Sequence, residues 1–330
     1  MDSFEGKRAV VTGGGSGMGR ELVAQLAAAG CSVATCDLHP AGLTETLSRA
    51  EAAAPVGTMI TTHLCDVSDE AQVLRFHDEV TAAHGEVLEL MFNTAGIGGG
   101  GSLIADSRED WERTFAVDFW GVYYCTRAFL PNLIGASEAV LVNTSSVNGF
   151  WASLGPGIPH TAYSTAKFAV KGLSESLIED FRVNAPHVHV AVVMPGHIGT
   201  DIVANSRRYF GRPEPDALTE SDLEETRKVL SRRGIAAGQF TSDQLRDLVK
   251  MLEEGFRDGA PLDAAGAAHV ILDGVLAGKW RILVGDDAHR LDESVRADPE
   301  GAYEHQGVGI SPLSFGGDFP GGMDQGPAQS

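Results

Sequence analysis

Tyr163 and Lys167 stand four positions apart in a stretch that suits a helix. At that spacing the two side chains share one helix face, so the lysine ammonium can stabilise the tyrosine phenolate. This help is needed because an unperturbed tyrosine has a pKa of about 10 and is a poor base at neutral pH. Ser146 ends an earlier Asn-Thr-Ser-Ser run, and its hydroxyl could hold the same substrate oxygen as the Tyr163 hydroxyl. The three side chains are therefore candidates for acid–base catalysis.

A second chemical signal is the glycine-rich turn over residues 13–19, which lies between a strand-like run and a helix that begins near Arg20. Backbone N–H groups at the start of a helix bind anions, and glycines let the backbone approach a pyrophosphate closely. A tight strand-to-helix turn also needs glycine when no ligand binds, so the turn alone is a weak signal. The predicted phosphate contacts are Gly13, Ser16, Gly17, Met18 and Gly19.

The next strand-like run ends at Asp37. In dinucleotide-binding folds a carboxylate at this place accepts hydrogen bonds from the adenosine ribose and repels a 2′-phosphate. Residues 38–40 are Leu, His and Pro, so no lysine or arginine offsets that repulsion. The pattern predicts NAD rather than NADP as the cofactor.

Further motifs follow in order along the chain. The glycine turn has the form TGxxxGxG, residues 93–96 read NTAG, residues 163–167 read YSTAK and residues 195–200 read PGHIGT. In this order they resemble the TGxxxGxG, NNAG, YxxxK and PGxxxT motifs of the short-chain dehydrogenase/reductase family. The resemblance covers residues 7–200 and extends to a last strand at residues 281–284. Several motifs in order are far more specific than any one of them.

The resemblance implies a role for each matching residue. Asp66 and Val67 would hold the adenine ring, while Tyr163 and Lys167 would contact the cofactor as well as perform catalysis. The other cofactor contacts that it implies are Asn93, Ala95, Gly96, Pro195, Gly196, Ile198 and Thr200.

The sequence departs from the family pattern at two places. Asp118 stands where the family commonly has an asparagine that positions a proton-relaying water. An aspartate can accept from the same water but brings a negative charge near Lys167, and we include it as a fourth catalytic candidate. The connection from Ser146 to Tyr163 is longer than usual, and residues 150–157 look like the inserted part.

Phe150 and Trp151 follow Ser146 closely, and His197 lies within the PGHIGT segment. These three residues, with Ser146 and Tyr163, are the predicted substrate contacts. An aromatic, apolar entrance indicates a hydrophobic secondary alcohol or its ketone, which NAD-dependent hydride transfer would interconvert. Two alternatives stay open: a binding protein that senses NAD without turnover, and a dehydratase or epimerase on the same fold.

The elements that must position these groups alternate along the chain. Strand-like runs cover residues 7–12, 32–37, 59–64, 89–93, 139–144, 189–194 and 281–284. Helix-like stretches between them include residues 20–29, 71–84, 110–133 and 264–277. Strands that alternate with helices predict an α/β fold: a Rossmann-like, doubly wound, seven-stranded parallel sheet in a single domain.

Residues 201–262 interrupt this alternation with a charged, helix-prone insertion. Because it follows the sixth strand at the carboxyl end of the sheet, we expect a helical lid, with an apolar stripe from Leu245 to Phe256 to dock it. We assign residues 1–285 to the catalytic domain and residues 286–330 to a C-terminal extension. Its residues 301–330 are rich in glycine and proline and are expected to be irregular.

Composition limits the partners. Among 330 residues, 25 Lys and Arg stand against 45 Asp and Glu, a net charge of −20 that disfavours nucleic acids and anionic membranes. No apolar run reaches the roughly 18 residues of a membrane span, and no signal peptide or metal-ligand set is visible. The four cysteines form no CxxC pair, which favours a reduced, cytoplasmic protein. The resemblance implies a homodimer or homotetramer, with candidate interface residues Trp120, Tyr123, Tyr124 and Phe129.

Overall fold

The computed structural model describes residues 1–304 except residues 100, 156–158 and 233–236. The expected seven-stranded parallel sheet is present, with the strand order β3-β2-β1-β4-β5-β6-β9. The strands are β1 (Arg8–Thr12), β2 (Ser32–Asp37), β3 (Ile60–Leu64), β4 (Leu90–Asn93), β5 (Ala139–Thr144), β6 (Val188–Pro195) and β9 (Arg281–Val284). The order reverses between β1 and β4, and crevices at such a reversal are where doubly wound sheets bind ligands. The single doubly wound domain is confirmed.

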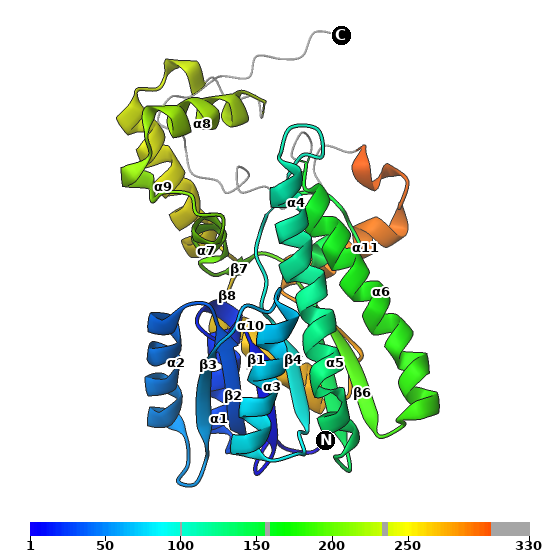
Figure 1. Cartoon of the computed structure of the whole chain (residues 1–330). Coiled ribbons are helices and arrows are strands. Elements are labelled where there is room, and N and C mark those ends of the chain that lie inside the picture. The colour runs from blue at the N-terminus through cyan, green and yellow to red at the C-terminus, as the bar shows by residue number, and fades with distance from the viewer. Residues whose placement is uncertain (100, 156–158, 233–236, 305–330) are drawn as a thin grey trace.

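Helices cover both faces of the sheet (Figure 1). On one face α1 (Gly17–Ala28) packs between α2 (Pro40–Ala53) and α10 (Ala264–Leu276). On the other face lie α3 (Glu70–His84), α5 (Gly121–Ile134) and α6 (Thr161–Asn184). Because helices cover both faces of the sheet, the ends of its strands are the accessible part. We therefore expect a ligand site at the strand ends.

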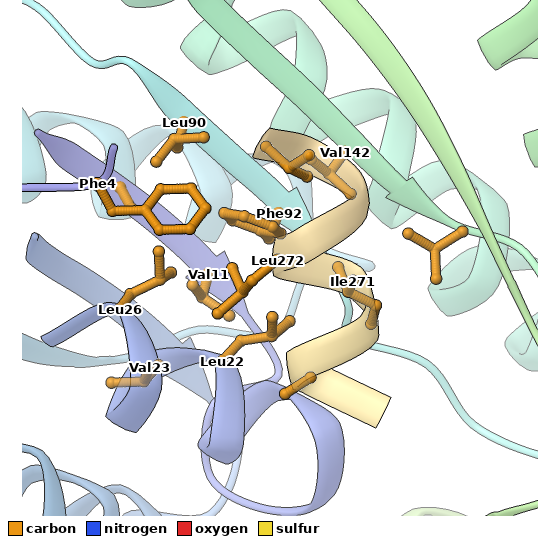
Figure 2. Close-up of a cluster of buried hydrophobic side chains, with 14 of the residues drawn as sticks. Phe4, Val11, Leu22, Val23, Leu26, Leu90, Phe92, Val142, Ile271 and Leu272 are labelled. Carbon is orange, nitrogen blue, oxygen red and sulfur yellow. The ribbon is translucent and has the colours of Figure 1, made fainter. Parts of the chain in front are cut away.

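The core under α1 and α10 shows how the sheet is fixed (Figure 2). Leu22 and Leu26 of α1 meet Phe92 of β4, Leu272 of α10 and the N-terminal Phe4, and all five side chains are buried. Burying a leucine or phenylalanine contributes about 1.5–3 kcal/mol. This packing holds β1 and β4 rigidly beside each other below the crevice.

The segment predicted as one helix over residues 110–133 is divided into three. It consists of α4 (Arg108–Phe115), a π-helical turn (Ala116–Trp120) and α5. A π turn inserts an extra residue and redirects the side chains within it. Asp118 lies in this turn and is completely buried. The predicted helix therefore exists, but its middle turn is widened where Asp118 points inward.

Phe129 is not an interface residue, contrary to the sequence expectation. Its ring is buried on α5 and packs edge-on against Phe76 of α3. Trp120 and Tyr123 remain exposed, with Tyr124 stacked on Trp120. The candidate interface is reduced to these three aromatic residues.

The insertion after β6 begins and ends at a small parallel sheet, in which β7 (Ile198–Gly199) pairs with β8 (Leu262–Asp263). Between these strands lie α7 (Ile202–Tyr209), α8 (Glu220–Arg232) and α9 (Ser242–Asp258). Figure 1 shows α8 and α9 standing beyond the carboxyl ends of the main sheet.

The apolar stripe of α9 packs mainly inside the insertion. Leu245 and Leu248 are buried against Leu223 and Leu230 of α8, in a cluster separate from the main core. The stripe thus holds α8 and α9 together. From the sequence we expected instead that it docks the insertion onto the domain. Phe256, at its end, contacts the His197 ring of the PGHIGT segment, with the two rings tilted by 50°.

The C-terminal extension folds back onto the domain through α11 (Asp286–Ala297) and a short 3-10 turn (Gly301–Tyr303). This turn belongs to the stretch that was expected to be irregular, and residues 305–330 of that stretch lie outside the described residues. Among the helices that the structure describes, none combines the length and the apolar character of a membrane span.

Candidate active site

Helix α6 brings Tyr163 and Lys167 together. The Lys167 ammonium lies 5.3 Å from the centre of the Tyr163 ring, as expected for side chains one helical turn apart. Lys167 is buried, and its Nζ donates a hydrogen bond of 3.2 Å to the carbonyl of Thr144 at the end of β5. This bond anchors the ammonium at the carboxyl edge of the sheet.

Ser146 lies two residues beyond β5 and interacts through its side chain with Tyr163. Its Oγ accepts a hydrogen bond of 3.1 Å from the backbone N–H of Asn148, which fixes the hydroxyl at the start of a 3-10 turn. The neighbouring Ser145 instead donates to the carbonyl of Lys167 over 2.7 Å. Because the Ser145 hydroxyl already donates its hydrogen to a backbone carbonyl, the geometry favours Ser146 as the hydroxyl beside Tyr163.

Asp118 approaches the same group from the π turn. Its Oδ1 lies 3.0 Å from Lys167 Nζ and accepts a hydrogen bond of 3.2 Å from the N–H of Ile97. The other carboxylate oxygen, Oδ2, is buried without a hydrogen-bond partner among the described residues. The structure therefore unites all four predicted catalytic residues, with Asp118 bound directly to Lys167.

Burial and charge act in opposite directions on these groups. Burial raises the pKa of Tyr163, Lys167 lowers it, and the negative charge of Asp118 raises it again. Burial lowers the pKa of Lys167, but the charge and hydrogen bond of Asp118 together with the charge of Tyr163 outweigh that effect and leave the pKa raised. Asp118 thus keeps Lys167 cationic while opposing ionisation of Tyr163.

The glycine turn is shaped to receive an anion. Ser16 makes no side-chain cap to the α1 backbone within the described chain, so the first N–H groups of α1 stay available. A side chain at Gly13 would collide with Ala95, and one at Gly19 would collide with the Gly13 carbonyl. These residues fit a pyrophosphate held at the N-terminus of α1, with Met18 in its first turn.

Arg20 of α1 and Thr46 of α2 together support the glycine turn. No sequence motif indicates this role of Arg20. Its guanidinium donates to the carbonyl of Gly15 over 2.5 Å and to the hydroxyl of Thr46 over 3.1 Å. Thr46 in turn donates to the carbonyl of Gly14 over 2.7 Å. The loop is therefore held in shape by bonds from α1 and α2.

Asp37 is oriented at the end of β2. Its Oδ2 accepts a hydrogen bond of 2.9 Å from the N–H of Gly15, and its Oδ1 accepts one of 3.0 Å from the N–H of His39. A side chain at Gly15 would come within 2.7 Å of the Asp37 carboxyl carbon. The glycine therefore allows this carboxylate to lie directly beside the phosphate-binding turn.

Two further loops reach the crevice from the other side. In the first, Asp66 Oδ1 accepts from both the N–H and the hydroxyl of Ser68, while Val67 packs against Gly121. In the second, the N–H of Ala95 donates to the Thr12 hydroxyl over 3.1 Å, which links the ends of β4 and β1.

Asn93 and Gly96 both lie next to buried polar side chains of the protein. The Asn93 amide is buried and donates to Thr126 and Asn143. A side chain at Gly96 would lie 2.7 Å from Asp118 Oδ1. Gly96 therefore makes room for the Asp118–Lys167 pair, whereas Asn93 uses its amide to stabilise the end of β4.

The PGHIGT segment closes the crevice from β6. The N–H of Gly196 bonds to Val284, Ile198 is buried in β7, and a side chain at Gly17 would lie 3.2 Å from Thr200. Pro195 is the last residue of β6. This segment therefore lies close to the glycine turn, as a contact with the cofactor requires.

The family model for short chain dehydrogenases matches residues 7–209, which include all of these groups. The chain belongs to the short-chain dehydrogenase family. It is accordingly an oxidoreductase with the family's Rossmann-like fold.

Similar proteins span most of the chain. SadH from Mycobacterium tuberculosis is 33% identical over 296 residues, covering 90% of this chain and 92% of SadH. Meso-2,3-butanediol dehydrogenase from Serratia marcescens is 31% identical over 199 residues, covering 60% of this chain and 74% of that enzyme. A short-chain dehydrogenase/reductase from Burkholderia phymatum, solved in complex with NAD, is 29% identical with a TM-score of 0.71, covering 93% of this chain and 98% of that one.

In this dehydrogenase, two of the predicted substrate contacts, Trp151 and His197, are buried and bind to other parts of the protein. Trp151 is 1% exposed, and its Nε1 donates to the carbonyl of Ala302 in the C-terminal extension over 3.0 Å. His197 is 2% exposed, and its Nε2 lies 2.6 Å from the carbonyl of Phe256 in α9. Both side chains join distant elements, so we correct their assignment from substrate contact to structural support. Phe150 is only partly buried and remains a candidate.

Proposed function

We propose that this dehydrogenase interconverts a hydrophobic secondary alcohol and its ketone, with NAD as the cofactor. The observation that carries the proposal is the grouping of Ser146, Tyr163 and Lys167 at the carboxyl edge of the sheet, next to an uncapped, glycine-lined helix start. The Burkholderia phymatum relative that was solved with NAD, and Asp37 in its place at the end of β2, support the choice of cofactor.

Each residue has a distinct task in this reaction. The Tyr163 hydroxyl exchanges a proton with the substrate oxygen, and Ser146 donates a hydrogen bond to that oxygen. Lys167 stabilises the Tyr163 phenolate, because its ammonium is held over the ring by Thr144 and Asp118. The nicotinamide, when bound, supplies or accepts the hydride. Asp118 Oδ2, which has no hydrogen-bond partner among the described residues, can accept from a water that returns protons through Lys167.

The substrate class follows from the apolar side chains near these groups. Phe150 follows the Ser146 turn, and Ile202 and Phe210 approach the Gly98–Gly99 backbone from the insertion. Apolar side chains at these positions support an alcohol on an apolar skeleton as the substrate.

The test is NADH formation, followed at 340 nm, with a panel of secondary alcohols that runs from short linear to ring-containing compounds. Turnover that increases with apolar size supports the proposal. A protein that binds NADH and turns over none of the alcohols or ketones would instead be a sensor, or would catalyse a dehydration or an epimerisation.

We further propose a cytoplasmic homodimer or homotetramer, in which the exposed Trp120 and Tyr123 on α5 and the preceding turn contribute to the interface. Light scattering of the wild type and of a Trp120→Ser variant tests the interface, and a smaller assembly is expected for the variant.

We also propose that residues 201–262 act as the lid over the active site, with α7 nearest to the cofactor.

Replacing Asp118 with asparagine is expected to move the pH profile of alcohol oxidation to lower pH. Oxidation requires ionised Tyr163, so its rate rises with pH through the Tyr163 pKa. Asp118 raises that pKa, and removing its charge must therefore lower the pKa and shift the rising limb toward acid. The measurement is kcat/KM against pH. Glu109→Gln, which removes an exposed charge on α4, is the control and should leave the profile in place.

A further inference from the structure

Helix α7 crosses the crevice between β1 and β4 and contacts both of its sides. One side consists of the loops after β3 and β4, which include Ser68 and Gly98. The other side is the glycine turn, which includes Ser16. Three α7 residues that share one helix face, Asn205, Ser206 and Tyr209, make these contacts.

The attachment to the β4 side is strong. The N–H of Gly98 donates to Ser206 Oγ over 2.8 Å, and Arg113 of α4 donates to the carbonyl of Tyr209 over 2.6 Å. The Arg113 guanidinium also lies about 5 Å above the Tyr209 and Phe210 rings. Tyr209 adds a side-chain contact with Ser68 and packs against the core on that face. These contacts fix the C-terminal half of α7.

The attachment to the glycine turn is much weaker. Within the described part of the chain, the hydrogen bond from Asn205 Nδ2 to Ser16 Oγ, 3.0 Å long, is the one side-chain hydrogen bond between α7 and residues 13–19. Arg208 donates to Asn205 Oδ1 over 2.9 Å. Because an arginine can only donate, the amide oxygen must face Arg208 and the amide NH₂ must face Ser16. The bond is thus oriented by a neighbour on the same helix.

We propose that the Asn205–Ser16 hydrogen bond is a latch that holds α7 across the cofactor crevice and slows both entry and release of the dinucleotide. The inference rests on the proposed use of NAD. A serine hydroxyl can accept from Asn205 and donate to a pyrophosphate at the same time, so the latch can stay closed over bound cofactor. Opening breaks the Asn205–Ser16 bond, while the contacts of α7 with Arg113 and Gly98 stay in place.

The test is stopped-flow NADH binding, followed by nicotinamide fluorescence without any alcohol or ketone, on Asn205→Ala. Losing one neutral hydrogen bond is expected to raise both the association and the dissociation rate constants about three- to tenfold. The matched control is Val203→Ala, an exposed position on the same helix, which should match the wild type. Circular dichroism and the Tm of both variants check that α7 and the fold remain.

Three outcomes would count against the latch or its premise. Rate constants equal to those of Val203→Ala would overturn the latch while leaving the proposed function intact. A rise in the dissociation rate constant alone would also overturn it, because Asn205 would then be a direct contact of bound cofactor and no barrier to entry. If the wild type itself fails to bind NADH, the proposed cofactor is wrong and the latch fails with it.

Discussion

Replacing Tyr163 with phenylalanine is expected to lower kcat by about 10²–10⁴-fold. The substitution removes the one hydroxyl that we expect to exchange a proton with the substrate, and it keeps the ring below the Lys167 ammonium. Lys167 stays anchored by Thr144 and Asp118, so the surrounding geometry should survive. The measurement combines steady-state turnover with NADH binding, whose affinity should stay nearly unchanged.

Tyr123→Phe is the matched control, since Tyr123 is an exposed tyrosine on α5. It should retain the turnover of the wild type. A Tyr163→Phe enzyme that kept a third of its activity would show that another group moves the proton. The assignment of Ser146 and Lys167 as partners of Tyr163 would then need revision as well.

The second large effect concerns the choice of cofactor. NAD is expected to bind about 30- to 150-fold more tightly than NADP, which corresponds to about 2–3 kcal/mol. The Asp37 carboxylate is held by the N–H groups of Gly15 and His39 before any ligand binds, so it meets a ribose without reorganisation. It can accept from the ribose hydroxyls and repels a 2′-phosphate. Dissociation constants for NADH and NADPH, measured by fluorescence titration, test this expectation.

Asp37→Ala should narrow the difference between the cofactors, mainly by weakening NAD. Asp286→Ala, which removes an exposed carboxylate from the first turn of α11, controls for a general loss of negative charge. Equal affinity of the wild type for both cofactors would contradict the role given to Asp37.

The sheet was predictable because its signal is local and repeated. Short apolar runs alternate with amphipathic ones, and strands covered on both faces must be apolar. The predicted spans of β2, β5 and β9 agree with the structure, and β1 begins one residue later, at Arg8. Helix periodicity places Lys167 beside Tyr163, whereas Ser146 and Asp118 became candidates through the resemblance to the family's motifs.

Features that depend on distant partners were not predictable. The π turn at Asp118 contains no glycine or proline, and the residue that pairs with Asp118, Lys167, lies on another helix. Trp151 follows Ser146 closely in the sequence, yet the group that accepts a hydrogen bond from its indole, the Ala302 carbonyl, belongs to the C-terminal extension. Asn205 belongs to no motif, and its bond to Ser16 becomes visible only when α7 is placed over the crevice.

The pairing of β7 with β8 makes the insertion a module. Ile198 lies opposite Leu262, so the chain leaves and re-enters the domain at neighbouring points whatever lies between. Doubling the length of such a closed loop costs only about 0.6 kcal/mol of chain entropy. Evolution or design can therefore exchange α8 and α9, whose leucines form a core of their own, without rebuilding the sheet. The β7–β8 pair is therefore the point at which a different helical insertion could be joined to the same sheet.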